Sequence, residues 1–301
     1  MDLFRENLQA AWTTYSMIFE EGLKVASGHY KEFCTVVGGE SQQAIEFPFL
    51  ETFAFMREWI GPRQIKNLAT RKLRIQEKAF EDTVRVRMRD IQTDNWGVYT
   101  PIIKNMGAAC ESLWDRLAAE ALLNPAVWID DQPFFSEDRT YGESTICNIG
   151  SGALNAANFE KAYAAMQMYE GHNGEPLDVV PDLLIVGPEN RAAAFEILEL
   201  ERVPNAEGTL SVANRNYKLA RIQVNPRIRG KYKNFWFLAA TGGAVLPVVL
   251  QKNVTGKIVA LDQDKDEPVF MNGDIIYGTC AYGNAACAFP HLLYRGGTVA
   301  E

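Results

Sequence analysis

The strongest constraint on the fold is a run in which apolar and charged side chains alternate. Between Thr83 and Arg89, apolar residues at 84, 86 and 88 alternate with polar or cationic residues at 83, 85, 87 and 89. A period of two is typical of a β-strand with one apolar and one charged face. A similar run at 73–76 predicts a second strand, and the two together predict a ribbon. Because an isolated two-stranded ribbon is only marginally stable in water, we expect it to lie on another structure.

The predicted ribbon is cationic, whereas the rest of the chain is acidic. The 301 residues carry a formal charge of −8, yet residues 57–90 hold ten basic side chains against five acidic ones. That stretch is therefore +5 and the remainder −13, so the ribbon of one copy could complement the body of another. The overall acidity argues against wholesale binding of nucleic-acid phosphates, which requires clustered Lys and Arg.

Two amphipathic helices are predicted on either side of the ribbon. In the first twenty residues, apolar side chains recur at steps of three and four, which predicts a helix that docks on its own chain or on a neighbouring subunit. Thr100 as a cap, Pro101 in the first turn and Asn124-Pro125 as a terminator predict a helix over 101–123. That helix would be about 35 Å long, roughly twice the mean helix length, and we interpret it as a beam.

From about residue 150 the pattern becomes α/β. Helices are expected over 158–169 and 189–200, and a polar loop over 204–217. Strands are expected at 182–186, 220–224 and 235–239, where apolar side chains are concentrated. The last sixty residues alternate short strands with turns.

The sequence contains no recognisable enzyme site. No phosphate-binding glycine loop or GxSxG elbow is complete, and the five cysteines form no CxxC pair, which disfavours disulfides and structural zinc. Asp262, Asp264 and Asp266 begin like a calcium loop, but Glu267 stands at position six and Gly273 at position twelve. We expect a solvated acidic loop there, with a weak divalent-cation site as the alternative. No catalytic residue, cofactor or metal is predicted.

Two further features bear on location. No apolar run approaches the ~18–20 residues that span a bilayer. The first six residues carry acids where a signal peptide needs a basic region. We therefore expect a protein that is made and kept in a cytoplasm, without a membrane partner.

One segment is specific enough to indicate a family. Residues 55–68 read FMREWIGPRQIKNL, which closely resembles the major head (capsid) protein family of phage Mu and Mu-like prophages, gene product T. The resemblance continues collinearly over nearly the whole chain and is strongest at 55–107. Pro62, Asp131 and Arg139 depart from the pattern, since an acid, a glycine and a histidine, respectively, are common there.

This resemblance implies an α+β protein with the Hong Kong 97-like phage capsid fold. In that fold an N-terminal arm would occupy residues 1–45, and an extended β-hairpin, the E-loop, residues 46–92. A peripheral P-domain would comprise 93–149, with its spine helix at 101–123. An axial A-domain would follow at 150–245, and residues 246–301 would return to the P-domain sheet.

The resemblance also implies a function. The chain would be the major capsid protein of a Mu-like tailed bacteriophage, forming hexamers and pentamers of an icosahedral head that encloses double-stranded DNA without sequence-specific binding. Its partners would be further copies of itself and separate scaffold or protease, portal and decoration proteins. It would reside in the virion after assembly in the host bacterial cytoplasm. An encapsulin-type compartment shell, which shares the fold, is the alternative.

Subunit contacts are expected from aromatic residues of the arm and ribbon base and from the cationic side chains of the ribbon. The polar loop 204–217 is expected at the capsomer axis. The predicted contact residues are Phe4, Trp12, Phe55, Arg57, Trp59, Arg63, Lys66, Arg71, Arg74, Arg85, Arg87 and Arg89.

Overall fold

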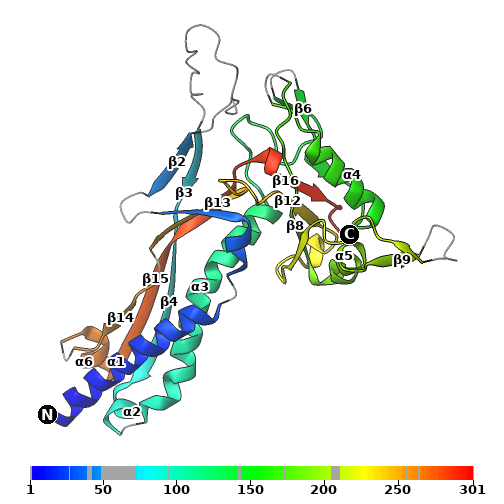
Figure 1. Cartoon of the computed structure of the whole chain (residues 1–301). Helices are drawn as coiled ribbons and strands as arrows, with labels where there is room; N and C mark the ends of the chain where they lie inside the picture. The colour runs from blue at the N-terminus through cyan, green and yellow to red at the C-terminus, as the bar shows by residue number, and fades with distance from the viewer. Residues whose placement is uncertain are drawn as a thin grey trace.

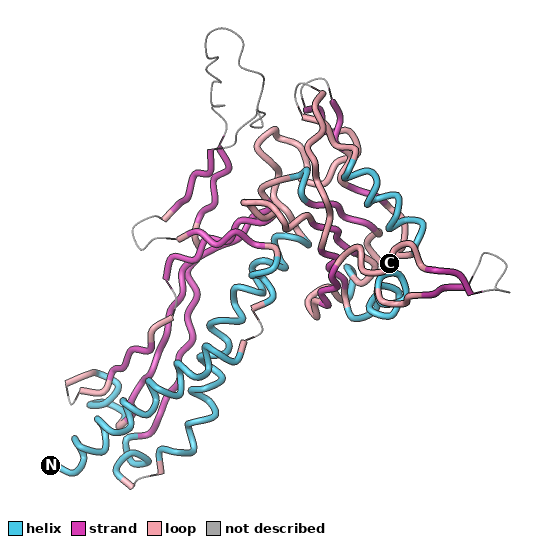
Figure 2. Tube along the Cα trace, in the orientation of Figure 1, coloured by secondary structure: helices cyan, strands magenta, loops and turns pink. Residues whose placement is uncertain are grey.

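Two five-stranded sheets, each accompanied by helices, occupy the two ends of an elongated molecule (Figures 1 and 2). The long helices α1 and α3 run beside the first sheet, and the shorter α4 and α5 lie beside the second. No helix among the described residues has the length and hydropathy needed to cross a membrane. This computed structural model describes residues 2–26, 28–38, 43–48, 72–93, 95–141, 144–171, 174–204, 211–254, 256–263 and 265–300.

The first sheet is organised around the 14-residue strand β15, which would be about 46 Å long when extended. One edge of β15 pairs with β4 along residues 274–283, and the other edge pairs with β14 and then β13. Strand β1 extends the sheet beyond β13. The strands are β1 (Cys34–Val37), β4 (Lys78–Arg87), β13 (Val248–Val254), β14 (Ile258–Leu261) and β15 (Asp274–Cys287).

Helices α1 (Asp2–Val25) and α3 (Thr100–Leu123) cross at two glycines. A Cβ atom on Gly22 would lie 2.2 Å from the Lys104 carbonyl oxygen, and one on Gly107 would lie 2.2 Å from the Phe19 carbonyl oxygen. The backbones therefore touch where no other residue fits. Ala11, Tyr15 and Phe19 of the predicted stripe are buried here, so of the two alternatives α1 docks on its own chain.

The predicted beam is confirmed as α3, with one difference at its start. Thr100 is already helical, and Tyr99 occupies the cap position without a capping side-chain bond. The helix ends at Asn124, as expected. Fourteen of its 24 residues are buried, so α3 is a core element as well as a beam.

The second sheet has the order β11-β8-β12-β16-β7. Every residue of β8 and β12 is buried, as their apolar composition predicts for strands covered on both faces. The Asn155 side chain caps α4 by accepting a 2.8 Å hydrogen bond from the Asn158 amide. The elements are β7 (Ile149–Gly150), α4 (Ala156–Gln167), β8 (Leu183–Val186), α5 (Arg191–Leu198), β11 (Arg221–Val224), β12 (Trp236–Ala239) and β16 (Leu293–Gly296).

The remaining elements are short. Within the described ranges, the hairpins β5–β6 and β9–β10 extend from the second half, and the short helices α2 and α6 and five 3-10 turns link larger elements. They are α2 (Met88–Gln92), β5 (Arg139–Tyr141), β6 (Ser144–Ile146), β9 (Arg202–Pro204), β10 (Ser211–Ala213), α6 (Glu267–Asn272), η1 (His29–Glu32), η2 (Trp96–Tyr99), η3 (Pro188–Asn190), η4 (Gly230–Tyr232) and η5 (Pro290–Leu292).

The predicted pairing of 73–76 with 83–89 is wrong. Strand β3 (Lys72–Gln76) pairs with β2 (Ala44–Pro48), whereas β4 pairs with β15 over ten residue pairs. The reason is burial, because Val86 is fully buried in the main core only when β4 lies in the sheet. Residues 78–92 of the expected E-loop therefore belong to the first sheet and α2, and the arginines at 85, 87 and 89 are not on a ribbon that leaves the body.

A second correction concerns the return of the chain after residue 246. Strands β13, β14 and β15 lie together in the first sheet, whereas β16 pairs with β12 and β7 in the second sheet, so the segment 246–301 does not belong to one sheet. Leu293 in β16 is fully buried in the main core, so this placement completes the second sheet.

A buried guanidinium holds the loop before β5. The Arg139 side chain is 1% exposed and pairs with the Asp130 carboxylate. It also donates to the carbonyls of Pro133 (2.6 Å) and Phe134 (3.2 Å), and its Cζ atom lies 4.6 Å from the centre of the Trp128 ring. Arg139 therefore organises a loop that has little regular structure of its own.

A buried histidine gives the protein a predictable pH dependence. His291 is 7% exposed, and burial lowers the pKa of its imidazole from 6.5 to about 3. The imidazole of the unfolded chain binds a proton at its ordinary pKa, whereas the buried imidazole of the folded chain stays neutral down to about pH 3. The stability of the folded state is therefore unaffected by His291 above about pH 6.5, and it falls as the pH decreases from 6.5 toward 3. Between pH 6 and 4, the free energy of unfolding of the unmodified chain should fall by up to about 1.4 kcal/mol per pH unit more than that of His291→Phe. Urea unfolding at several pH values measures this difference, and equal slopes would contradict it.

Candidate functional site: surfaces for subunit contact

The β2–β3 ribbon leaves the first sheet and extends away from the body (Figures 1 and 2). Its strands pair from Ala44 opposite Gln76 to Pro48 opposite Lys72. An ion pair of 2.7 Å joins Lys72 Nζ to Glu46 Oε2, and this hydrogen bond lowers the pKa of the Glu46 carboxyl. Both side chains are about half exposed, so the pair contributes little to stability but keeps the register of a solvated ribbon.

One predicted contact residue lies on this ribbon within the described part of the chain. Arg74 is exposed on β3 and stands opposite Glu46. The backbone of Phe4 belongs to α1, but its side chain is outside the described residues. Six predicted contact residues also lie outside the described part of the chain: Phe55, Arg57, Trp59, Arg63, Lys66 and Arg71.

Three predicted cationic residues form a basic strip where β4 ends and α2 begins. We use this name for Arg85, Arg87 and Arg89, which are all exposed. Arg85 Nη1 lies 3.3 Å from Asp274 Oδ2, and 71% of the Arg85 side chain remains exposed. Charged side chains on a strand at the edge of a sheet discourage unspecific pairing, and the same charges are available to a specific neighbour.

Trp12 lies against its own chain. Its ring stacks on Tyr277 at a centroid distance of 6.2 Å, and Tyr15 meets the same ring edge-on at 5.1 Å. Trp12 is only partly buried, so its contact with a neighbouring subunit stays a prediction.

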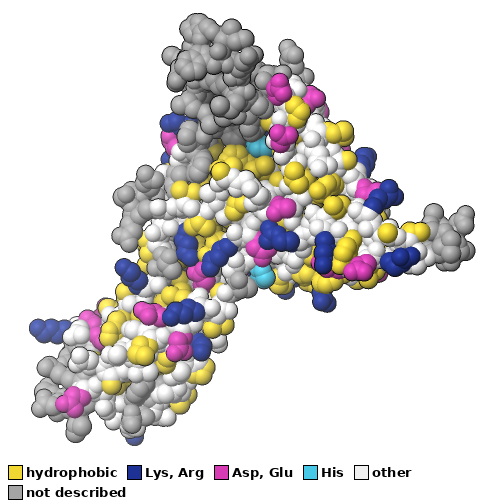
Figure 3. All heavy atoms as spheres, in the orientation of Figure 1, with side chains coloured by type: hydrophobic (Ala, Val, Ile, Leu, Met, Phe, Trp, Pro, Cys, Tyr) yellow, Lys and Arg dark blue, Asp and Glu magenta, His cyan; other side chains and the backbone are white. Residues whose placement is uncertain are grey.

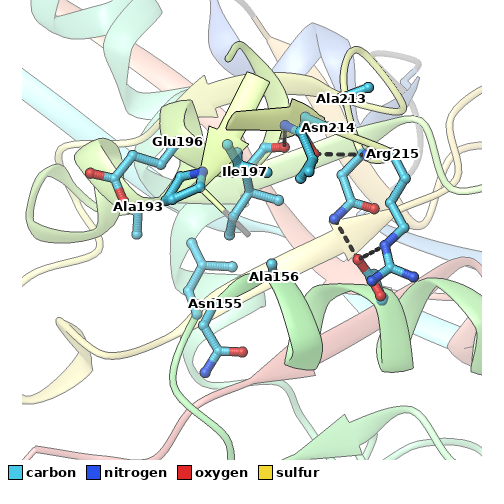
Figure 4. Close-up of a pocket in the computed structure, with 14 residues that line it drawn as sticks. Asn155, Ala156, Ala193, Glu196, Ile197, Ala213, Asn214 and Arg215 are labelled. Carbon is cyan, nitrogen blue, oxygen red and sulfur yellow. Dashed lines mark hydrogen bonds and ion pairs between the residues drawn. The ribbon is translucent and has the colours of Figure 1, made fainter. Parts of the chain in front are cut away.

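The β9–β10 hairpin stands over a cavity of about 610 Å³ between α4 and α5 (Figure 4). Asn214 Nδ2 donates to the carbonyls of Ile197 (2.9 Å) and Leu200 (2.7 Å), which fixes the hairpin to the end of α5. Glu160 of α4 accepts from Arg215 at 3.1 Å and Asn216 at 2.8 Å. The expected polar loop is therefore a hairpin with a braced base, and its place at a capsomer axis stays a prediction.

The acidic segment 262–266 shapes a local turn. The Gln263 amide donates to Asp266 Oδ2, and the Gln263 side chain donates to Asp262 Oδ1, both at 2.8 Å. Asp264 lies outside the described residues. Among the residues described, no group of three His, Cys, Asp or Glu side chains could hold a metal ion.

The buried thiols have no chemical activation in the described structure. Burial raises the pKa of Cys34, Cys110 and Cys287, so these thiols stay protonated at neutral pH.

On the face shown in Figure 3, basic and acidic side chains are interspersed rather than gathered by sign. This face thus offers many small polar contacts instead of one strongly charged site.

Sequence reasoning missed the strand β2 and the residues that hold the ribbon base. The segment 44–48 alternates weakly and ends in Pro48, so its pattern is poor evidence for a strand. The base is held by Asn253 and Asn284, which are more than 175 residues from their partners in sequence. No local pattern could have revealed them.

Comparison with known proteins agrees with the predicted family and fold. A profile of the Mu-like prophage major head subunit gpT family matches residues 8–153, 148–228 and 220–298. The major capsid protein of Escherichia phage Mu is 29% identical over 136 residues, a match that spans only 44% of each chain.

Solved structures show the fold. A capsid chain of bacteriophage JBD30, in a capsid decorated with minor capsid protein trimers, is 24% identical with a TM-score of 0.57, covering 69% of this chain and 93% of that one. The encapsulin SrpI of Synechococcus elongatus PCC 7942 is 11% identical with a TM-score of 0.53, covering 91% of this chain and 88% of that one. The fold is therefore the Hong Kong 97-like capsid fold, which phage heads and encapsulins share. The fold alone does not distinguish a phage head protein from an encapsulin, whereas the family profile does. By that match, over most of its length, the chain belongs to the Mu-like prophage major head subunit family.

Proposed function

We propose that this chain is the major capsid protein of a Mu-like tailed bacteriophage and assembles into the icosahedral head that encloses double-stranded DNA. The observation that carries the proposal is the family match across residues 8–298. The β2–β3 ribbon supports it, because an arm that leaves its own sheet can rest on the next copy. Repetition of such a contact between copies generates closed symmetric assemblies.

The physical basis of assembly is many weak contacts used in every copy. Hexamers and pentamers form when the ribbon and the basic strip of one subunit meet the acidic body of the next. Because exposed ion pairs contribute only ~0–1 kcal/mol each, these charges give register, and apolar contacts supply most of the affinity. The net charge of −8 favours a wall that repels packed DNA rather than binding its sequence.

Further partners follow from this role. A scaffold or protease, a portal and decoration proteins act as separate chains, and the assembled protein resides in the virion after assembly in the host cytoplasm. An encapsulin-type shell is the competing function, supported only by the shared fold. It would be favoured if purified particles carried a stoichiometric enzyme cargo in place of DNA.

Charge reversal in the basic strip tests the assembly proposal. Arg85→Glu/Arg87→Glu should abolish closed particles, because it removes two positive charges and adds two negative ones opposite an acidic neighbour. The free subunit should remain folded, since both side chains are exposed and the ion pair of Arg85 with Asp274 is worth only ~0–1 kcal/mol. Negative-stain microscopy measures particles, and thermal unfolding measures the subunit.

The matched control is Arg85→Lys/Arg87→Lys, which keeps the charge and should assemble. Raising the ionic strength should also lower the particle yield of the unmodified chain, since salt screens exposed charges. Normal particles from the charge-reversed chain would overturn the role given to the basic strip.

A further inference from the structure

We propose that Asn253 and Asn284 are positioning residues, which set the direction in which the β2–β3 ribbon leaves the first sheet. Their contacts belong to a single chain and are independent of assembly. Their consequence for particle formation rests on the proposed function. We call the hydrogen bonds that these two side chains make the amide latch.

The latch lies where backbone pairing stops. The ladder between β4 and β15 ends with Lys78 opposite Gly283. Only Glu77 separates β4 from β3, which turns away to pair with β2. The next residue of β15, Asn284, uses Nδ2 to donate to the Gln76 carbonyl oxygen at 2.8 Å. A side-chain amide thus takes over from the backbone ladder at the point of departure.

The second half of the latch comes from a β-bulge. The register between β13 and β15 shifts between Lys252 and Val254, which leaves Asn253 as the extra residue. Bulges turn a side chain in a new direction, and here Asn253 Nδ2 donates to Glu77 Oε2 at 2.6 Å. Asn253 is 9% exposed, so this charge-assisted bond is partly shielded from water. The Glu77 amide also donates to the Gln43 carbonyl at 3.0 Å, which ties in the segment before β2.

An apolar contact attaches the base of the ribbon to the first sheet but does not set the direction of the ribbon. Ile75 is 2% exposed and packs with Val249 and Ala288 in a small cluster separate from the main core. Such contacts are non-directional and tolerate sliding. Hydrogen bonds have strict distance and angle requirements, so the amide latch fixes the angle.

The angle between the ribbon and the first sheet matters because a small rotation at the base of the ribbon produces a large displacement at its far end. The five residues of β3 extend about 16 Å, so a 20° change at Gln76 moves the far end by about 6 Å. That displacement exceeds the length of any hydrogen bond, and every copy in a shell would carry the same error. Pre-organising the ribbon also removes an ordering cost from each contact.

Reversing donor and acceptor gives a decisive test. Asn253→Asp places two carboxylates against each other and should release the ribbon. Glu77→Gln keeps an acceptor for Asn253 and should behave like the unmodified chain. The double variant, Asn253→Asp/Glu77→Gln, restores the bond with a glutamine donor and a carboxylate acceptor, so it should rescue the geometry.

Spin-label distance measurements on unassembled subunits give the direct readout. Labels are placed at the exposed positions Arg74 and Val259 after Cys147 and Cys280 are replaced by serine. We expect one narrow distance population in the unmodified chain, a broad distribution in Asn253→Asp, and a narrow one again in the double variant. Glu77→Ala, a milder loss of the same bond, should also broaden the distribution.

The control uses the other half of the latch. Asn284→Asp should broaden the distribution as well, but Glu77→Gln should not rescue it, because Asn284 donates to a backbone carbonyl. Particle yield should fall about tenfold in Asn253→Asp and recover in the double variant, a factor that corresponds to roughly 1.4 kcal/mol.

Unchanged distances in both Asn253→Asp and Glu77→Ala, or absence of rescue, would overturn the amide latch. If the unmodified chain formed no particles, the proposed function would fail, while the distances in the free subunit would still decide the latch.

Discussion

Arg139→Met should lower the free energy of unfolding by about 3–5 kcal/mol, the usual cost of removing one partner of a buried ion pair. Methionine fills much of the same space, so the loss is chiefly electrostatic. Asp130 would keep a carboxylate with only 20% of its side chain exposed. The carbonyls of Pro133 and Phe134 would lose their shared donor. Urea unfolding followed by tryptophan fluorescence measures the change.

Two further variants separate charge from packing at this position. Asp130→Asn in the Arg139→Met background should recover part of the loss, because it removes the unpaired charge. Arg139→His, the residue that the family resemblance suggests here, should be milder since an imidazole can still donate to Asp130 or a carbonyl. A loss below about 1 kcal/mol in Arg139→Met would show that the pair is not a structural clamp.

Gly107→Leu should detach α1 from α3 and cost about 3 kcal/mol or more. The first side-chain carbon would already lie 2.2 Å from the Phe19 carbonyl, and neither backbone can yield without separating the helices. Separation would expose Tyr15 and Phe19, each worth about 1.5–3 kcal/mol when buried. Limited trypsin digestion should then cut α1 at Lys24.

Gly97 provides the matched control for this prediction. A Cβ atom there meets nothing within 4 Å, so Gly97→Leu should leave both stability and the digestion pattern nearly unchanged. Equal effects of the two substitutions would mean that the glycine crossing does not hold α1.

The helices and buried strands could be predicted because their evidence is local. The stripe of α1, the proline and terminal asparagine of α3, and the apolar run of β8 each lie within a few turns or residues. The cationic strand was also recognised as a strand. Its partner was not, because alternation identifies which face is apolar but not which strand lies alongside, and the residues of β15 are almost 200 positions away.

Some features of the candidate contact surfaces could likewise be predicted from local sequence, and others depend on tertiary contacts. Exposure of Arg85 and Arg87 follows from the period of two, so sequence alone could place them on a surface, whereas Arg89 is exposed on the short helix α2 and not on the predicted strand. Their attachment to the body depends on Val86 reaching the core, which is a tertiary contact. The asparagines of the latch depend on a bulge and on the end of a ladder, and both arise only when distant strands meet.

The position of β16 has a consequence for synthesis on the ribosome. This strand lies between β12 and β7, so the second sheet has a gap until residues 293–296 have left the exit tunnel. A chain that ends before residue 293 lacks β16 and leaves the edge of β12 that β16 covers without its partner strand. The second sheet is therefore completed only at the end of synthesis, and a truncated chain should expose an unpaired strand edge that other strands can bind.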